Sequence, residues 1–194
     1  MARTSEPEAS IQAIVLGRIG ADLYPQQVST PLEHVRTFER FVGGFAVNVA
    51  TGLVRLGIRV AIVSAIGDDG HGRFVRQFLT SEGVDVEWLH VHPTLRTALA
   101  FCEAWPPDHF PLTYYRLPTC PDWELRPSDL PLEEIARVPL LFVTGTGLAR
   151  EPSRSATLAA LECRRTQRPD RADSPTRATW LPATILDLDW RESL

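Results

Sequence analysis

Lysine is absent from this sequence of 194 residues, so all 20 of its basic residues are arginine. A nucleotide-binding loop of the Walker A type places a lysine on the phosphates, and Schiff-base catalysis needs a lysine amine. Both kinds of site are therefore excluded. Arginine can still bind a carboxylate or a phosphate through two parallel hydrogen bonds.

Cysteine and long apolar runs are also scarce. The three cysteines, Cys102, Cys120 and Cys163, are odd in number and lack metal-like spacing, which predicts free thiols in a reducing cytoplasm and no zinc site. No apolar run approaches the ~20 residues that cross a bilayer. The net charge of −4 favours neither nucleic acid nor an anionic membrane as a partner. We expect a cytoplasmic protein with no nucleic-acid or membrane partner.

The first ten residues, MARTSEPEAS, contain acidic residues and no apolar core. They do not match a signal peptide, and we expect residues 1–10 to form a disordered lead-in. A hydrophobic content of 44% over the whole chain is ordinary for a globular protein. Residues 11–194 are therefore expected to form one domain, or most of one α/β unit.

Apolar runs and amphipathic stretches alternate along most of the chain. The expected strands cover residues 11–16, 59–67, 139–145 and 183–189, and the expected helices cover residues 45–56, 72–82, 131–138 and 151–165. This succession predicts a three-layer α/β/α fold with a parallel sheet and right-handed crossovers. Residues 166–182 are rich in Arg, Asp and Pro, and we expect them to form a flexible loop.

Two regions that prolines interrupt depart from this succession. Apolar and polar residues alternate in residues 24–42, and again in the pieces VEWLHVH, TALAFCEAW and LTYYRL of residues 84–118. Such alternation predicts edge strands of a small antiparallel sheet. We expect residues 24–42 and 88–118 to combine into one lid over the parallel sheet. A ligand site is expected at the carboxyl ends of the parallel strands, where Gly17, Gly67, Gly145 and Asp187 fall.

The stretch GGFAVNVATGLVRLG, residues 43–57, leads from two adjacent glycines into a helix. Gly43 and Gly44 would let a ligand approach the free N–H groups at the positive end of the helix, although a plain turn would also explain the pair. Asn48, expected to be buried among apolar residues, would gain most by hydrogen-bonding a group outside the helix. The face expected to pack inward carries Phe45, Val49, Leu53 and Leu56, with Gly52 allowing close approach and Gly57 ending the helix.

Three further patterns are weaker evidence for a ligand or metal site. GTGLAR imitates a dinucleotide-binding loop, but Arg150 stands where the third glycine should be. Asp187 and Asp189 alternate onto one face at a strand end, which favours a substrate-binding or structural role over a metal site. His90 and His92 share one face in the same way, and a pair of lid histidines is more typical of a surface than of a ligand site.

Small and polar residues between positions 43 and 67 point to a known family. They are Gly43, Gly44, Ala46, Asn48, Ala50, Gly57 and Gly67. In this spacing they resemble the first signature of the ribokinase-like (PfkB) sugar kinases, and the expected lid is similar to the β-sheet lid of that family. The stretches GRIGADLYPQQ, PPDHFPLTYYRLPTCPD, GTGLAREPSRSATLAAL and LDLDWRESL resemble one branch, the 5-dehydro-2-deoxygluconokinases of inositol catabolism.

The resemblance implies a site for a sugar acid. An aspartate at the end of the first strand would accept hydrogen bonds from sugar hydroxyls, two lid residues would reach down, and an arginine near the end of the chain would meet the substrate carboxylate. The implied residues are Asp22, Gly43, Gly44, Asn48, Tyr114, Arg116 and Arg191. Plainer alternatives stay open, because Asp22 could be a turn residue and Arg116 a charge that guards an edge strand.

The same resemblance implies an ATP-dependent sugar-acid kinase with ATP and Mg²⁺ as cofactors, although no motif here binds them visibly. The family's catalytic base is an aspartate in a Gly-x-Gly-Asp motif, which this sequence lacks, since AIGDD at residues 65–69 belongs to the first signature. We therefore expect the sugar-binding half of a truncated or frameshifted kinase, with the C-terminal half missing, that is inactive alone. The alternative is a natural remnant that acts as a non-catalytic sugar-acid-binding or dimerisation module, with a homodimer formed through the lid.

Overall fold

The computed structural model describes residues 10–166 of the chain. Its larger sheet has the strand order β5-β4-β1-β8, and all three pairings within it are parallel. The strands are β1 (Ala13–Leu16), β4 (Val60–Gly67), β5 (Leu89–His92) and β8 (Leu140–Val143). Every residue of β1 and β4 is buried, as expected for parallel strands with both faces covered.

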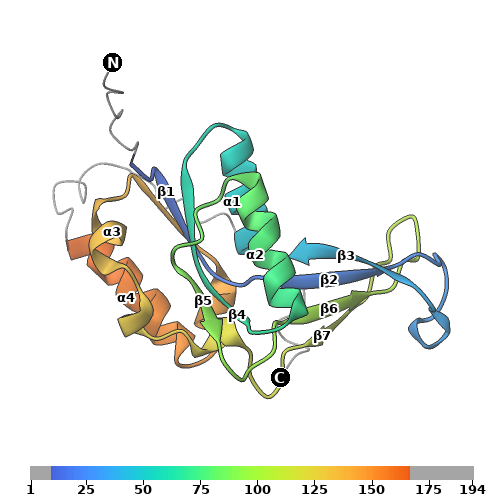
Figure 1. Ribbon diagram of the computed structural model, residues 1–194. Helices are drawn as coiled ribbons and strands as arrows, with labels where there is room; N and C mark the ends of the chain where they lie inside the picture. Colours follow the sequence, from blue (N-terminus) through green and yellow to red (C-terminus); the bar gives the residue numbers. More distant parts are fainter. Residues whose placement is uncertain (1–9, 167–194) are drawn as a thin grey trace.

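Helices cover both faces of this sheet (Figure 1). They are α1 (Phe45–Arg55), α2 (Gly70–Glu82), α3 (Leu132–Arg137) and α4 (Ser153–Thr166). One core cluster joins α1 and α2 to the sheet through Val15 and Ile62, whereas the other joins α3 and α4 through Ile14 and Val63. The predicted three-layer α/β/α fold is confirmed.

A second, small sheet extends from one side of the parallel sheet (Figure 1), with the strand order β3-β2-β6-β7. Its strands are β2 (Gly20–Pro25), β3 (Phe38–Gly43), β6 (Leu99–Cys102) and β7 (Leu112–Tyr115). The two hairpin-like pairs are antiparallel, but β2 and β6 run parallel. The small sheet is therefore mixed, which corrects the expectation of a purely antiparallel one.

Short 3₁₀ helices lie in the connections. They are η1 (Leu32–His34), η2 (Pro121–Glu124), η3 (Pro127–Asp129) and η4 (Gly145–Leu148). The second of them directly follows the chain's return from the small sheet, and the last follows the carboxyl end of β8. Both therefore lie at the junction between the two sheets.

Two expected strand placements are wrong. The piece VEWLHVH does not join the small sheet, because Ser64 pairs with Leu89 and Gly67 with His92 at the edge of the parallel sheet. An edge strand with one covered face alternates as a lid strand does, so the pattern alone could not separate the two. Asp22 is not at the end of the first strand either, since β1 ends at Leu16 and Asp22 lies within β2.

The expected inward face of α1 is also wrong in part. Leu56 follows the helix end and is 80% exposed, while the helix buries Ala46, Val47, Ala50 and Thr51. A Cβ atom placed on Gly52 would meet nothing within 4 Å, so this glycine does not serve close packing on the sheet. Small residues, rather than the large ones, let this helix approach the strands. The end of the helix is as predicted, because Gly57 has a positive φ of 84°.

The expected strand 183–189 and Arg191 lie outside the described residues, as do the lead-in up to residue 9 and the expected loop from residue 167 onward. Among residues 10–166, no helix has the length and apolar character needed to cross a membrane.

Candidate functional site

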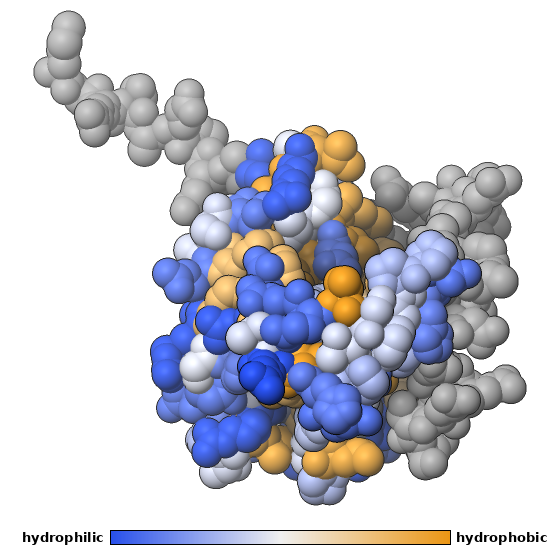
Figure 2. All heavy atoms as spheres, turned by 90° about the vertical axis from the view of Figure 1, so that its right-hand side faces the viewer, coloured by the Kyte–Doolittle hydropathy of each residue, from blue (hydrophilic) through white to orange (hydrophobic). Residues whose placement is uncertain are grey.

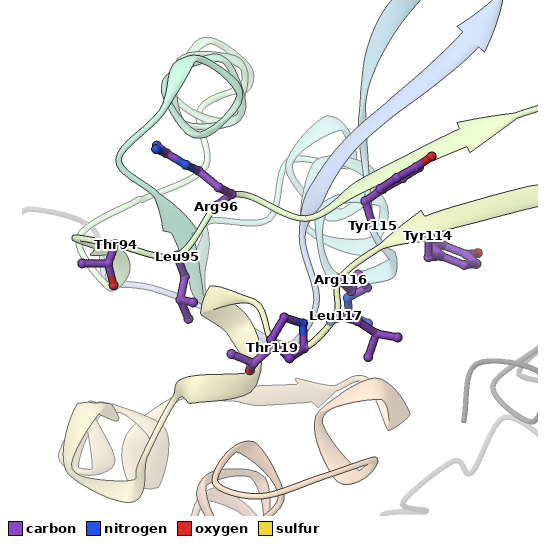
Figure 3. A pocket seen from close by; sticks show the side chains of 9 residues that line it. Thr94, Leu95, Arg96, Tyr114, Tyr115, Arg116, Leu117 and Thr119 are labelled. Carbon is purple, nitrogen blue, oxygen red and sulfur yellow. The ribbon is translucent and has the colours of Figure 1, made fainter.

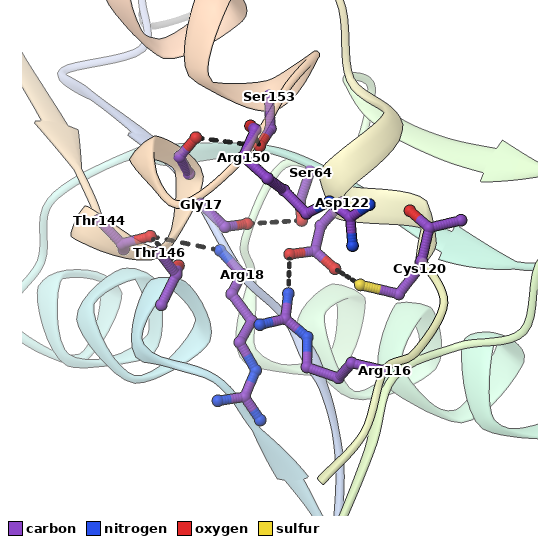
Figure 4. Close-up of polar contacts among 12 residues, drawn as sticks. Gly17, Arg18, Ser64, Arg116, Cys120, Asp122, Thr144, Thr146, Arg150 and Ser153 are labelled. Carbon is purple, nitrogen blue, oxygen red and sulfur yellow. Dashed lines mark hydrogen bonds and ion pairs between the residues drawn. The ribbon is translucent and has the colours of Figure 1, made fainter. Parts of the chain in front are cut away.

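The carboxyl ends of the parallel strands open toward the small sheet, and hydrogen bonds tie the connections there together (Figure 4). The hydroxyl of Ser64 at this end of β4 donates to the carbonyl oxygen of Gly17 at 2.6 Å. The hydroxyl of Thr144, just after β8, accepts from the backbone N–H of Arg18 at 3.4 Å. Neighbouring strands thereby position the loop between β1 and β2, from which the small sheet begins.

The register of the small sheet places Asp22 and Tyr114 in one row. Asp22 pairs with Phe41 on one side and with Ala100 on the other, and Ala100 in turn pairs with Tyr114. Paired residues of neighbouring strands point to the same face of a sheet. The small side chain of Ala100 therefore separates two polar side chains that share the face.

Gly43 provides the space that the carboxyl group of Asp22 occupies. A Cβ atom at Gly43 would lie 2.1 Å from the carboxyl carbon and from both carboxyl oxygens. No side chain other than hydrogen fits at this position while Asp22 keeps its place. The glycine that the sequence pattern singled out thus acts through a neighbouring strand, since Gly43 pairs with Gly20 two residues before Asp22.

The carboxyl group of Asp22 is held in a poorly solvated place. Its Oδ1 atom is buried and has no hydrogen-bond partner among residues 10–166. Burial raises the pKa of Asp22 above its ordinary value, and the positive charge of Arg18 partly opposes this rise. A buried acceptor without a donor costs free energy unless something else supplies the hydrogen. Asp22 is therefore suited to accept a hydrogen bond from a hydroxyl group of a ligand.

Arg18 is the cation whose charge acts on this carboxyl group, and it spans the junction. Its guanidinium carbon lies 4.7 Å from the centre of the Tyr114 ring on β7, while its backbone is fixed at the end of β1. Its Nε atom is buried and has no hydrogen-bond partner in the part of the chain that the structure describes. Arg18 is not among the site residues predicted from the sequence, although its place directly after Gly17, which follows β1, was a signal that could have found it.

The surroundings of Gly44 and Asn48 differ from those expected from the sequence. A Cβ atom at Gly44, where φ is 104°, would lie 2.5 Å from the carbonyl oxygen of Arg18 and 2.7 Å from Cα of Ile19. The missing side chain therefore admits the protein's own β1–β2 loop. Asn48 is exposed, and its expected burial among apolar residues is wrong, because the buried positions of α1 are its small neighbours.

Arg116 lies in a buried cluster that follows β7 (Figure 4). Only 9% of its surface is exposed. One of its terminal nitrogens donates to Asp122 at 2.6 Å, and its guanidinium carbon lies 3.9 Å from the centre of the Trp123 ring. The alternative of a guard on an edge strand does not fit, because Arg116 is buried and follows the end of the strand. A neutralising carboxylate and an aromatic face hold this guanidinium in one orientation.

Two more residues complete this cluster. The thiol of Cys120 donates to Asp122 at 3.1 Å. Burial, followed by the negative charge of Asp122, raises the pKa of that thiol to about 12, so Cys120 stays protonated at neutral pH. From the other side, Arg150 contacts the Trp123 ring at 4.9 Å and donates to the carbonyl oxygen of Pro118 at 2.7 Å. The sequence patterns assigned no site role to Cys120 or Trp123.

A shallow cleft of about 410 Å³ adjoins the cluster. One wall consists of the segment that enters β6, and the other of the end of β7 and the segment after it (Figure 3). The lining residues are Thr94, Leu95, Arg96, Tyr114, Tyr115, Arg116, Leu117, Pro118 and Thr119. The lining combines apolar side chains with hydroxyl and guanidinium groups, and those polar groups could hydrogen-bond a polar or anionic ligand.

The segment that enters β6 is fixed by Asp69, the N-cap of α2. Its carboxylate accepts from the backbone N–H groups of His71 and Gly72 and, at 2.8 Å, from that of Thr97. Burial alone would raise the pKa of Asp69, but these bonds and one from the Thr97 hydroxyl lower it below its ordinary value. Asp69 therefore joins a helix of the parallel layer to the small sheet.

Of the predicted site residues, the structure brings together Asp22, Gly43 and Tyr114. Arg116 lies near them but is committed to Asp122, and Arg191 lies outside the described residues. Within residues 10–166 no group of three or more His, Cys, Asp or Glu side chains could hold a metal ion. We assign none of the described residues to Mg²⁺ or to ATP.

The sequence of this chain is similar to a known protein family and to curated proteins. A family model described as pfkB family carbohydrate kinase matches residues 11–179. The chain is 36% identical over 158 residues to a 5-dehydro-2-deoxygluconokinase of Photobacterium profundum, and the match covers 81% of this chain and 47% of that protein. A 5-dehydro-2-deoxygluconokinase of Bacillus subtilis is 34% identical over 163 residues, or 84% of this chain and 50% of that protein. The chain thus spans about half the length of these curated relatives.

Solved structures share the fold. A PfkB protein from Polaromonas sp. JS666 superposes with a TM-score of 0.76 at 25% identity, over 81% of this chain and 53% of that one. An uncharacterized sugar kinase from Pyrococcus horikoshii in complex with ATP gives a TM-score of 0.71 at 23% identity, over 77% of this chain and 48% of that one.

Proposed function

This chain belongs to the pfkB family of carbohydrate kinases, and from that membership we propose that it supplies the sugar-binding part of a kinase that phosphorylates a sugar acid. The substrate we propose is 5-dehydro-2-deoxygluconate, because the curated relatives at about 35% identity are 5-dehydro-2-deoxygluconokinases. The phosphate donor would be ATP with Mg²⁺, as the family and the ATP complex of the Pyrococcus horikoshii kinase suggest.

The observation that carries the proposal is the unpartnered carboxyl oxygen of Asp22, on the face of the small sheet that also bears Tyr114. In this proposal Asp22 accepts a hydrogen bond from a substrate hydroxyl, and Gly43 leaves room for its carboxyl group. Tyr114 contacts the substrate from β7, and Arg116 provides a fixed donor. Hydroxyl recognition of this kind is specific, because a ligand without the hydroxyl leaves a buried acceptor unpaired.

The family resemblance implies further contacts with the substrate, which we also propose. Gly44 and the start of α1 would offer backbone N–H groups, and Asn48 would offer an exposed amide. For the substrate carboxylate the family resemblance implies Arg191, and Arg18 is the alternative partner proposed below. The positive end of a helix suits an oxygen-rich ligand.

Titration of the 194-residue chain with 5-dehydro-2-deoxygluconate in a calorimeter tests the proposal. We expect binding by the wild type and a loss of at least about tenfold in affinity for Asp22→Ala, because a hydrogen bond to a charged group contributes about 1.5–3 kcal/mol. Asp108→Ala removes an exposed carboxylate between β6 and β7 and is the matched control. Absence of binding by the wild type, or equal binding by the Asp22 variant, would contradict the proposal.

A second candidate function is a non-catalytic module that binds a sugar acid or a second copy of the chain through the small sheet. It is favoured by apolar and aromatic side chains exposed on that sheet, namely Tyr24, Phe41, Leu112 and Tyr115. Viewed from the side of the small sheet, polar residues cover most of the surface, with apolar patches between them (Figure 2). Binding of the sugar acid without ATP consumption would favour this function. A dimer that forms as the protein concentration rises would identify the partner as a second copy of the chain.

A further inference from the structure

We propose that Arg18 selects an acidic sugar over a neutral one by binding the carboxylate of the substrate at the junction between β1 and β7. This inference rests on the proposed function and deepens it. It assigns the carboxylate to a residue other than Arg116 or Arg191.

Arg18, which lies over the ring of Tyr114, and Arg116, which lines the adjoining cleft with Tyr114, differ in how their charges are balanced. Arg116 already has a carboxylate partner, Asp122, at 2.6 Å. Arg18 forms no ion pair within the described residues, so its positive charge is not neutralised by a contact with an acid. A substrate carboxylate gains more beside the uncompensated cation, since a partly buried charge is stabilised by an opposite charge.

Arg18 and Asp22 also carry unsatisfied polar atoms of opposite kind. Among the described residues, Nε of Arg18 is a buried donor without an acceptor, and Oδ1 of Asp22 is a buried acceptor without a donor. The two side chains do not satisfy each other, although they are close enough for the charge of Arg18 to lower the pKa of Asp22. A hydroxy acid offers both missing groups, because its hydroxyl donates to a carboxylate while its carboxylate accepts from a guanidinium.

Arg18 is held at both ends. Its backbone N–H donates to Thr144 at 3.4 Å, and its carbonyl oxygen accepts from the backbone N–H of Ala46 at the start of α1. Its guanidinium rests on the ring of Tyr114, which belongs to the small sheet. A side chain fixed in this way loses little further freedom when a ligand binds. A carboxylate bound by Arg18 would lie against the small sheet, next to the hydroxyl-binding residue Asp22.

The test compares two linear six-carbon ligands that differ in charge, D-gluconate and the neutral polyol D-glucitol. Both are titrated into the 194-residue wild type and into Arg18→Gln. We expect the wild type to prefer gluconate, and the variant to lose at least about tenfold in gluconate affinity while its glucitol affinity changes less than about twofold. Arg18→Lys keeps the charge without the fork of donors and should lose less than Arg18→Gln. Arg36→Gln, which removes an exposed guanidinium before β3, is the control and should change neither affinity.

A spectroscopic measurement locates the contact independently of affinity. In protein labelled with ¹⁵N at arginine, the Nε–H signal of Arg18 should shift on addition of gluconate and much less with glucitol. If Arg18→Gln keeps the preference for gluconate while Arg116→Gln or Arg191→Gln loses it, the assignment to Arg18 is wrong and the sugar-binding function stands. If the wild type binds neither ligand nor the dehydro sugar acid, the proposed function fails, and the role of Arg18 fails with it.

Discussion

In the parallel sheet every residue of the two central strands, β1 and β4, is buried, whereas the central strands of the small sheet, β2 and β6, each contain residues that are not fully buried. Helices press on the parallel strands from both faces, and apolar side chains fill the two layers between them. The small sheet, by contrast, has no such pair of helices over it among the described residues (Figure 1). Burial of apolar surface therefore contributes more to the stability of the parallel sheet than to that of the small sheet.

Polar anchors hold the small sheet instead. Asp69 binds the chain just before β6 through Thr97, and Asp122 binds it just after β7 through Arg116. The two anchors lie at the two ends of the β6–β7 pair, which carries Tyr114. The difference teaches that the core of this fold depends on apolar packing, while the position of the proposed site relative to that core depends on hydrogen bonds and one buried ion pair.

The largest effect is expected from Asp122→Ala, which breaks the second anchor. It leaves the buried guanidinium of Arg116 without its counter-charge, and removal of one partner of a buried pair costs about 3–5 kcal/mol. Urea unfolding followed by tryptophan fluorescence measures the loss. Glu162→Ala removes an exposed ion pair with Arg165 and should cost much less, because water and salt screen exposed charges. Equal costs for the two variants would show that the buried pair is no anchor.

One substitution of a large apolar side chain by alanine in each sheet tests the comparison of the two sheets. Ile62→Ala in β4 should lower the free energy of unfolding by about 2–5 kcal/mol, since Ile62 is fully buried and the variant leaves a cavity. Leu112→Ala in β7 should cost less than about 1 kcal/mol, because that side chain is 41% exposed. Chemical denaturation of both proteins checks this. A large loss for Leu112→Ala would mean that the small sheet is also stabilised by apolar burial.

Asp69→Asn tests the first anchor and its dependence on pH. One oxygen can still cap α2, but the amide group meets the N–H of Thr97 with a donor in place of an acceptor, and we expect a loss of about 1–3 kcal/mol at pH 7. Because the pKa of Asp69 is lowered in the folded state, its contribution is fully present above the unfolded pKa of about 3.9 and disappears as pH falls through the folded value.

Unfolding free energies of the wild type and of Asp69→Asn, measured from pH 7 down to about pH 3, should therefore converge in acid. Asp68→Asn changes an exposed neighbour and is the control. A difference between wild type and variant that stays constant over this range would contradict the assigned role of the Asp69 carboxylate.

Effects of opposite sign are expected from two glycines of the stretch 43–57, and the smaller of the two comes from Gly52. Gly52→Ala adds a Cβ in open space at a mid-helix position and should stabilise the protein by about 0.5–1 kcal/mol. Gly43→Ala places a Cβ against the carboxyl group of Asp22 and should destabilise by about 1–3 kcal/mol. Thermal unfolding distinguishes the signs. Stabilisation by both substitutions would mean that Asp22 moves aside without cost.

Much of the architecture could be predicted from the sequence, because buried strands and amphipathic helices each show a pattern of apolar residues that is visible within a few positions. The strand 60–67, the helix that follows it and the small sheet itself were found in this way. The strand 89–92 was assigned to the wrong sheet, since its alternation does not say which strand it pairs with. The burial of Asn48 was predicted wrongly because a helix can pack through its small residues instead of its large ones.

For the candidate site, the sequence singled out Gly43 and Gly44 by their place before a helix, whereas Asp22 and Tyr114 were implied only by the resemblance to a known family. Only the tertiary structure decided that Arg116 is neutralised by Asp122 and that Arg18 lies over Tyr114, 96 positions farther along the chain. Local patterns depend on neighbours a few residues apart, whereas charge pairing and burial depend on how distant segments pack. That packing is what places the unpaired donor of Arg18 beside the unpaired acceptor of Asp22.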